Sequence, residues 1–176
     1  MGEPNVGKSS IIERIIYDTF NFKIDLGGHS DSLDIYFENS LINIYFYDNF
    51  GQAYFRLIRE QYYPKSNGII LVYDITNRDS FEQCISYYNE RIKTLCSKNI
   101  KKILLGNKCD LNEKRVITTK EGLEFALENG FGFKEISCKS NQNVFGPIED
   151  LIIDIHNELI KDKPKTSLKL NNCEII

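Results

Sequence analysis

The N-terminal segment Gly2-Glu3-Pro4-Asn5-Val6-Gly7-Lys8-Ser9 is the part of the sequence that points most clearly to one fold. It fits the pattern GxxxxGK[ST], in which backbone N–H groups and the start of a following helix enclose phosphate groups. In that pattern the lysine supplies a positive charge and the serine a magnesium ligand. An amphipathic run follows, with Ile11, Ile12, Ile15 and Ile16 at helical spacing. A glycine loop that precedes a helix by chance is the alternative if this segment is taken alone.

Strand-like and helix-like runs alternate after this loop. Two runs, 33–37 and 41–47, are joined by a short polar link, which predicts an antiparallel hairpin. Residues 68–75 form a continuous apolar run, typical of a strand covered on both faces. The helix predicted next has its apolar stripe at Phe81, Ile85, Tyr88, Ile92 and Leu95. We predict a three-layer α/β fold of the P-loop NTPase type, with a mostly parallel central sheet and one antiparallel edge strand.

Length and composition indicate one globular domain. The chain has 176 residues, of which 41% are hydrophobic and 27% charged, and its net charge of −3 argues against nucleic acid as a partner. We expect the domain to span residues 1–160 and a flexible, lysine-rich tail to span 161–176. The five cysteines have no metal-ligand spacing, which favours reduced thiols in the cytoplasm. No apolar run is long enough to span a bilayer, and no secretory signal precedes the loop.

Three further segments carry polar residues at the ends of predicted strands. They are Asp48-Asn49-Phe50-Gly51-Gln52, Asn107-Lys108-Cys109-Asp110 and Ser137-Cys138-Lys139. In an open α/β sheet, ligands bind outside the carboxyl ends of the strands. We therefore expect these segments and the phosphate loop to meet at one site.

With these four segments in order, the chain resembles the Ras superfamily of small GTPases, and within it the Rab family. The Rab resemblance rests on residues 52–56, on Tyr62-Tyr63, and on residues 72–76 followed by 79–81. It implies a GTP-hydrolysing switch in vesicle trafficking, with GTP or GDP as the bound nucleotide and Mg²⁺ as cofactor. The nucleotide-binding residues that it implies are Gly2, Glu3, Pro4, Asn5, Val6, Gly7, Lys8, Ser9, Ser10, Phe20, Asp48, Gly51, Asn107, Lys108, Asp110, Ser137, Cys138 and Lys139.

The resemblance also implies how the base is read. Asn107 and Asp110 would recognise guanine, because a carboxylate can accept hydrogen bonds from both the ring N–H and the exocyclic amine. Lys108 and Lys139 would pack along the nucleotide, and the backbone of Ser137 and Cys138 would support the base. Phe20 would lie edge-on against the base; a core contact at the helix end is the alternative.

For hydrolysis, the resemblance implies that Ser9 and Asp48 hold Mg²⁺ and that Gln52 is the catalytic residue, which orients the attacking water. Effectors, an exchange factor and a GTPase-activating protein are the partners expected at the switch regions.

Three positions depart from the family pattern. At the threonine position of switch I the sequence has Asp25, counting back from Asp48, or Gly27, counting forward from Ser9, and neither has a hydroxyl. Pro4 removes one N–H from the phosphate loop, and Phe50 replaces an alanine. We therefore expect slow hydrolysis and a weakly ordered switch I. A hydrolysis-deficient adaptor that binds guanine nucleotide is the alternative. An adenine-using P-loop kinase is disfavoured by residues 107–110.

Cys173-Glu174-Ile175-Ile176 loosely fits a prenylation motif, with lysines upstream. A prenyl group on Cys173, with geranylgeranyl favoured by the last residue, would anchor the protein to the cytoplasmic face of an intracellular membrane. A buried or idle cysteine is the alternative.

The phosphate loop begins at residue 2, so the strand that precedes it in the family is missing from the sequence. Such a central strand buries about five apolar residues at about 2 kcal/mol each. Losing about 10 kcal/mol would consume most of a domain's stability of about 5 to 15 kcal/mol, so we expect a truncated chain.

Overall fold

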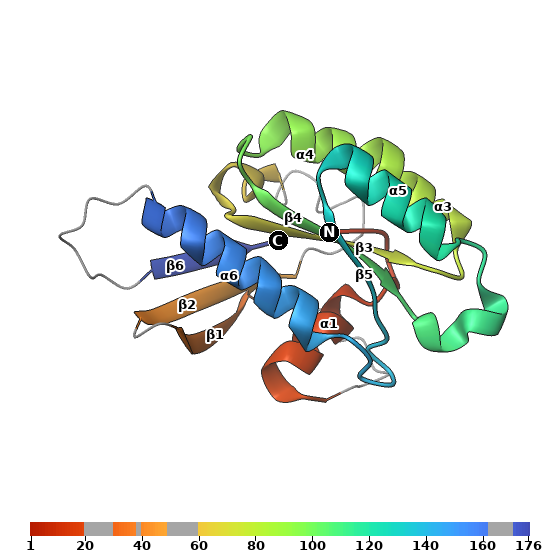
Figure 1. Cartoon of the computed structure of the whole chain (residues 1–176), viewed down its shortest axis with the longest axis horizontal. Coiled ribbons are helices and arrows are strands. Elements are labelled where there is room, and N and C mark those ends of the chain that lie inside the picture. The colour runs from red at the N-terminus through yellow and green to blue at the C-terminus, as the bar shows by residue number, and fades with distance from the viewer. Residues whose placement is uncertain (20–29, 38–39, 49–59, 162–170) are drawn as a thin grey trace.

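The computed structural model describes residues 1–19, 30–37, 40–48, 60–161 and 171–176. A six-stranded sheet runs through its middle in the order β1-β2-β6-β3-β4-β5 (Figure 1). β1 and β2 pair antiparallel, and every other neighbouring pair is parallel. This arrangement confirms the predicted fold class. The strands are β1 (Ser30–Phe37), β2 (Ser40–Tyr47), β3 (Gly68–Asp74), β4 (Lys101–Asn107), β5 (Gly132–Glu135) and β6 (Asn171–Ile175).

Helices cover both faces of the sheet. Figure 1 shows α1 (Lys8–Tyr17) and α6 (Phe145–Lys161) on one face. The other face carries α3, α4 and α5. The remaining helical elements are α3 (Arg78–Gln83), α4 (Asn89–Leu95), α5 (Thr119–Asn129), the 3₁₀ turns η2 (Tyr63–Lys65) and η4 (Cys109–Lys114), and the π turn η3 (Cys84–Tyr88).

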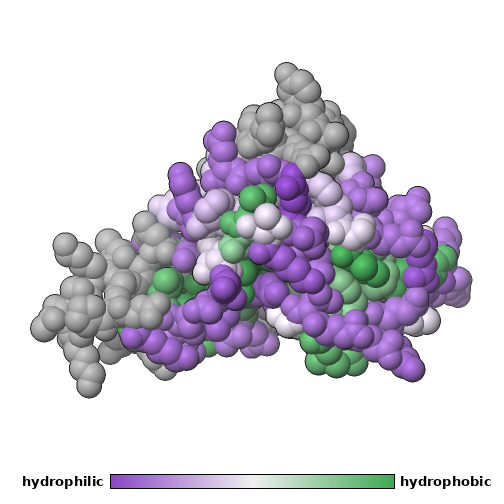
Figure 2. Space-filling model, turned by 90° about the horizontal axis from the view of Figure 1, so that it is seen from above, coloured by the Kyte–Doolittle hydropathy of each residue, from purple (hydrophilic) through white to green (hydrophobic). Residues whose placement is uncertain are grey.

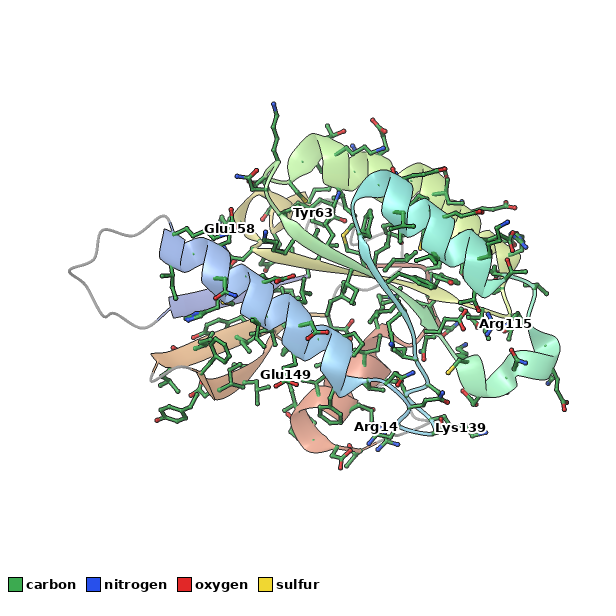
Figure 3. The ribbon with its side chains drawn as sticks, viewed as in Figure 1. Arg14, Tyr63, Arg115, Lys139, Glu149 and Glu158 are labelled. Atoms are coloured by element: carbon green, nitrogen blue, oxygen red, sulfur yellow. The ribbon has the colours of Figure 1, made fainter. Side chains whose placement is uncertain are left out.

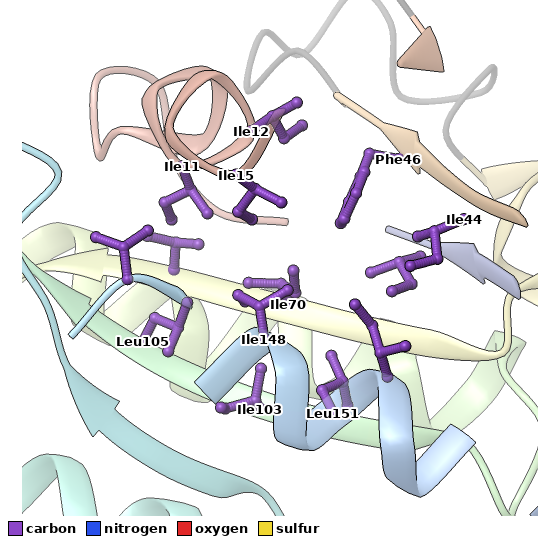
Figure 4. Close-up of a cluster of buried hydrophobic side chains, with 14 of the residues drawn as sticks. Ile11, Ile12, Ile15, Ile44, Phe46, Ile70, Ile103, Leu105, Ile148 and Leu151 are labelled. Carbon is purple, nitrogen blue, oxygen red and sulfur yellow. The ribbon is translucent and has the colours of Figure 1, made fainter. Parts of the chain in front are cut away.

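Two hydrophobic cores lie on the two sides of the sheet. Figure 4 shows the core beneath α1 and α6, where isoleucines of α1 face β2 and β3. The second core packs aromatic residues of α3 and α5 against the other side of β3 and β4. β3 is buried along its whole length, as its apolar run predicts. Seen from above, the surface is mostly hydrophilic, with hydrophobic atoms in small separate patches (Figure 2).

The helix over residues 78–95 differs from its predicted stripe. Ile85 is 42% exposed, and Cys84 is fully buried instead. The cause is the π turn Cys84–Tyr88, which places one extra residue in that turn and shifts the face that meets the sheet.

The C-terminal segment corrects another expectation. The predicted flexible tail begins at residue 161, but Asn171–Ile175 form β6, between β2 and β3 in the centre of the sheet. This is the position expected of the strand that precedes the phosphate loop. Cys173 is completely buried there, because its side chain faces the core beneath α1 and α6. The predicted lipid anchor would therefore require β6 to leave the sheet. Residues 162–170 lie outside the described residues.

Candidate nucleotide site

The phosphate loop depends on backbone conformations that favour glycine. Gly2, Asn5 and Gly7 have positive φ angles of 139°, 64° and 101°. A Cβ atom on Gly7 would lie 2.2 Å from Nδ2 of Asn107, so both the angle and the close approach require glycine there. Gly7 is the N-cap of α1, and within the described chain no side chain caps this helix. Its first N–H groups can therefore face an anion.

Lys8 and Ser9 begin α1 and carry the side chains that the motif requires. The Lys8 Nζ atom donates to the backbone oxygen of Glu3 at 2.8 Å, so its ammonium group lies across the loop. The Ser9 Oγ atom donates to Oδ2 of Asp48 at 2.5 Å, although 39 residues separate the two in sequence. A hydroxyl and a carboxylate oxygen together are ligands that Mg²⁺ prefers, so this pair fits the ion.

Asn107 links three of the four predicted loops. Its Nδ2 atom donates to the oxygen of Val6 in the phosphate loop at 2.8 Å. Its Oδ1 atom accepts from the N–H groups of Lys108 at 2.8 Å and of Cys138 at 3.3 Å. The Asn107 side chain is 2% exposed, so both ends of the amide are satisfied inside the protein. The predicted convergence of these loops thus follows from one buried amide.

The two acidic side chains beside Asn107 have defined partners. Asp110 accepts a hydrogen bond from the Ser137 hydroxyl at 2.6 Å, which is a second link between the loops 107–110 and 137–139. The Lys108 Nζ atom lies 2.7 Å from Oδ2 of Asp74, at the end of β3. Asp74 was not among the predicted site residues. Its position at the carboxyl end of a buried strand is the sequence signal that would have found it.

Arg14 of α1 is a second residue that sequence reasoning missed. Its Nε atom donates to the oxygen of Cys138 at 2.7 Å and its Nη2 atom to that of Lys139 at 3.3 Å. Figure 3 shows Arg14 beside the segment that carries Lys139. Nη1 also donates to the oxygen of Asp18 at 3.0 Å. The helix that follows the phosphate loop is thereby tied to the predicted base-binding loop.

Cys138 lies inside this network as a neutral thiol. Burial raises the pKa of Cys138 to about 12, against the opposing effect of its contact with Asn107. The predicted residues Phe20, Gly51 and Gln52 lie outside the described residues, as do Asp25 and Phe50. Ser10 lies in the first turn of α1.

A mainly parallel sheet, with a glycine loop at the start of α1 and polar loops at the strand ends, defines a P-loop nucleotide-binding protein. A sequence model of the Ras family matches residues 1–157 of the chain. The chain therefore belongs to the Ras family of small GTPases, which hydrolyse GTP to GDP and phosphate.

Rab proteins are among the relatives that match this chain in sequence. Rab-8A of Bos taurus is 36% identical over 163 residues, which cover 92% of this chain and 78% of the relative. RabQ of Dictyostelium discoideum is 39% identical over 145 residues, covering 81% and 71%. Rab-3C of Bos taurus is 33% identical over 180 residues, covering 99% and 79%. Within the Ras family, this chain is Rab-like.

Proposed function

We propose that the protein is a guanine-nucleotide switch of vesicle trafficking that acts on the cytoplasmic side of an intracellular membrane. The contacts of Asn107 with Val6 and Cys138 carry this proposal, because they join the phosphate loop to the two predicted base-binding loops. The Rab relatives support the trafficking role. Among the described residues, none of the helices has the length and hydrophobicity to cross a bilayer.

Each loop has a separate task in this proposal. The backbone N–H groups of residues 2–8 and the Lys8 ammonium group hold the phosphates, and Asp110 reads guanine. Ser9 and Asp48 hold Mg²⁺, which supplies positive charge against the phosphate oxygens. Gln52 is the residue proposed to orient the water. Effectors, an exchange factor and a GTPase-activating protein would read the loops that change with the nucleotide.

The test is the nucleotide content and affinity of the purified full-length chain. Denatured protein should release about one equivalent of GDP or GTP, since such nucleotides stay bound through purification. Asp110→Ala removes two charge-assisted hydrogen bonds worth about 1.5 to 3 kcal/mol each, so GDP affinity should fall at least about 100-fold. Glu113→Ala, in the same turn, is the control and should bind GDP normally. Unchanged GDP affinity in Asp110→Ala would contradict the proposal.

We propose that hydrolysis is slow. Pro4 supplies no N–H to the phosphate loop and adds bulk beside the γ-phosphate position. Phosphate release in a single turnover should therefore be faster in Pro4→Gly than in the parent chain. Equal rates in the two chains would remove Pro4 as the cause. The absence of phosphate release, even with an activating protein, would instead favour the adaptor alternative.

Cys173 is not used in this proposal. The prenyl group predicted for it stays a prediction, and the buried position of its thiol weighs against it.

A further inference from the structure

A hydrogen bond joins the phosphate loop to the helical segment 78–95, which covers the opposite side of the sheet from α1. The Tyr88 hydroxyl donates to Oε1 of Glu3 at 3.2 Å, although 85 residues separate the two in sequence. Glu3 is the second residue of the GxxxxGK[ST] pattern, and it is half-buried. The phosphate loop therefore contacts a residue that belongs neither to the motif nor to the loops at the strand ends.

Tyr88 is placed by the π turn Cys84–Tyr88. The residues at both ends of this turn are buried, with exposed fractions of 0% for Cys84 and 2% for Tyr88. Both belong to the core on the side of α3 and α5. The Tyr87 ring packs edge-on against the Tyr88 ring, with 5.0 Å between the ring centres. π turns are rare and occur frequently at functional sites, and this one ends at the tyrosine whose hydroxyl reaches the phosphate loop.

Glu3 brings a negative charge into a loop that is proposed to bind phosphates. Its backbone oxygen accepts from Nζ of Lys8 at 2.8 Å, so the carboxylate belongs to the residue that also holds the phosphate-binding ammonium group. A carboxylate free to turn towards Lys8 would compete with the phosphates for that ammonium group and would repel them. The hydrogen bond from Tyr88 ties the carboxylate to the helical segment instead.

We propose that Tyr88 is a positioning residue of the nucleotide site. Its hydroxyl fixes the Glu3 carboxylate against the helical segment and leaves the Lys8 ammonium group to the phosphates. This inference rests on the proposed function for its effect on nucleotide. Tyr88 acts through Glu3, so its contribution should depend on the charge of Glu3.

The test is a double-mutant cycle on GDP affinity in the presence of Mg²⁺. Tyr88→Phe removes only the hydroxyl, and it should weaken GDP binding about tenfold because a charged carboxylate loses its donor. Glu3→Gln provides a background in which the side chain keeps its length and loses its charge. In that background Tyr88→Phe should change GDP affinity less than about threefold, since no charge is released beside the phosphates.

Tyr73→Phe is the matched control. Tyr73 is a fully buried tyrosine of the same core, and its hydroxyl has no hydrogen-bond partner within the described part of the chain. Its replacement makes the same chemical change without breaking a hydrogen bond, so GDP affinity should stay within about twofold of the parent. If Tyr88→Phe weakened GDP binding equally in the parent and in Glu3→Gln, Tyr88 would act by packing alone and the proposal would be overturned. Parental affinity in Tyr88→Phe would overturn it as well.

Failure of the proposed function is distinguishable from failure of this inference. If the parent chain bound no guanine nucleotide, the proposed function and the effect of Tyr88 on nucleotide would both fall. Urea unfolding of the parent, Tyr88→Phe, Glu3→Ala and the double variant would then test the contact by itself. Tyr88→Phe should lower the urea midpoint of the parent more than that of Glu3→Ala, in which the hydroxyl has already lost this acceptor. Equal shifts of the midpoint would show that Tyr88 does not hold Glu3.

Discussion

At the scale of single residues, a few polar side chains determine whether distant loops form one site. Asn107 satisfies both ends of its buried amide with backbone groups of two other loops. A buried amide left without such partners would cost about 1 to 3 kcal/mol, so the loops hold one another in place. Arg14 does the same from α1, with a charged donor on the oxygens of Cys138 and Lys139.

Arg14 gives a prediction at this scale. Arg14→Met removes charge-assisted hydrogen bonds to the base-binding loop, and loss of about 1.5 kcal/mol corresponds to roughly tenfold faster GDP dissociation. Stopped-flow fluorescence with a fluorescent GDP analogue measures the dissociation rate. Arg14→Lys keeps one charged donor, so its rate of GDP dissociation should lie between those of the parent chain and Arg14→Met. The control is Arg91→Met, a substitution on α4 that breaks the ion pair of Arg91 with Glu60. Release at the parental rate from Arg14→Met would show that this arginine does not position the loop.

At the scale of elements, local rules explain both boundaries of α5. α5 begins with a capping box, in which the N–H of Glu121 donates to the Thr118 hydroxyl at 3.2 Å and the N–H of Thr118 donates to the Glu121 carboxylate at 2.7 Å. The helix ends at Gly130, whose φ of 68° is a conformation that favours glycine. Arg78 of α3 adds an ion pair to the same carboxylate at 2.7 Å.

This cap predicts how stability depends on pH. The bond from Arg78, followed by those from Thr118, lowers the pKa of Glu121 to about 2 from its ordinary 4.5. A lowered pKa in the folded state means that the charged carboxylate stabilises the fold above pH 4.5. That contribution is lost as the pH falls towards 2. The melting temperature of Glu121→Gln should therefore lie below that of the parent at pH 7, and the gap should narrow as the pH falls below 4.5.

Thermal unfolding between pH 3 and pH 7 checks this expectation. Glu124→Gln makes the same charge change on the same helix without the capping contacts, and it is the matched control. If the difference in melting temperature between Glu121→Gln and the parent stayed constant over this pH range, the assigned role of the carboxylate would be contradicted.

At the scale of the whole molecule, one sheet lies between the two cores, and both chain ends lie close together in its middle. β3 contributes alternate residues to both cores, whereas Cys173 and Ile175 of β6 belong to the core beneath α1 and α6. The candidate nucleotide site lies where the parallel strands end, next to the buried strands β3 and β4. Binding should therefore be coupled to the stability of the whole fold.

The coupling is measurable as a shift in unfolding. GDP with Mg²⁺ at about 100 times its dissociation constant should raise the free energy of unfolding by about 2.7 kcal/mol. Removing Mg²⁺ with EDTA should reduce the gain, since Ser9 and Asp48 would lose the ion between them and the phosphates. ADP at the same concentration is the control for base recognition. Equal stabilisation by ADP and GDP would contradict guanine selection by Asp110.

The sequence alone determined the fold class and the alternation of strands and helices as far as the predicted tail at residue 161, and it predicted the four loops of the candidate site. These properties depend on patterns that span ten or twenty residues, such as apolar periodicity, capping residues and glycine positions. The capping box of α5 and the buried run of β3 are examples, since each is complete within its own segment.

Only the tertiary structure decided the place of residues 171–176. Cys-Glu-Ile-Ile already alternates as a strand does, but four residues carry too little periodicity to distinguish a strand from a tail. The choice of partner depends on β2 and β3, which lie about 100 or more residues away in sequence. The contacts of Arg14 have the same origin, because they depend on groups 124 residues away that only the folded chain brings together.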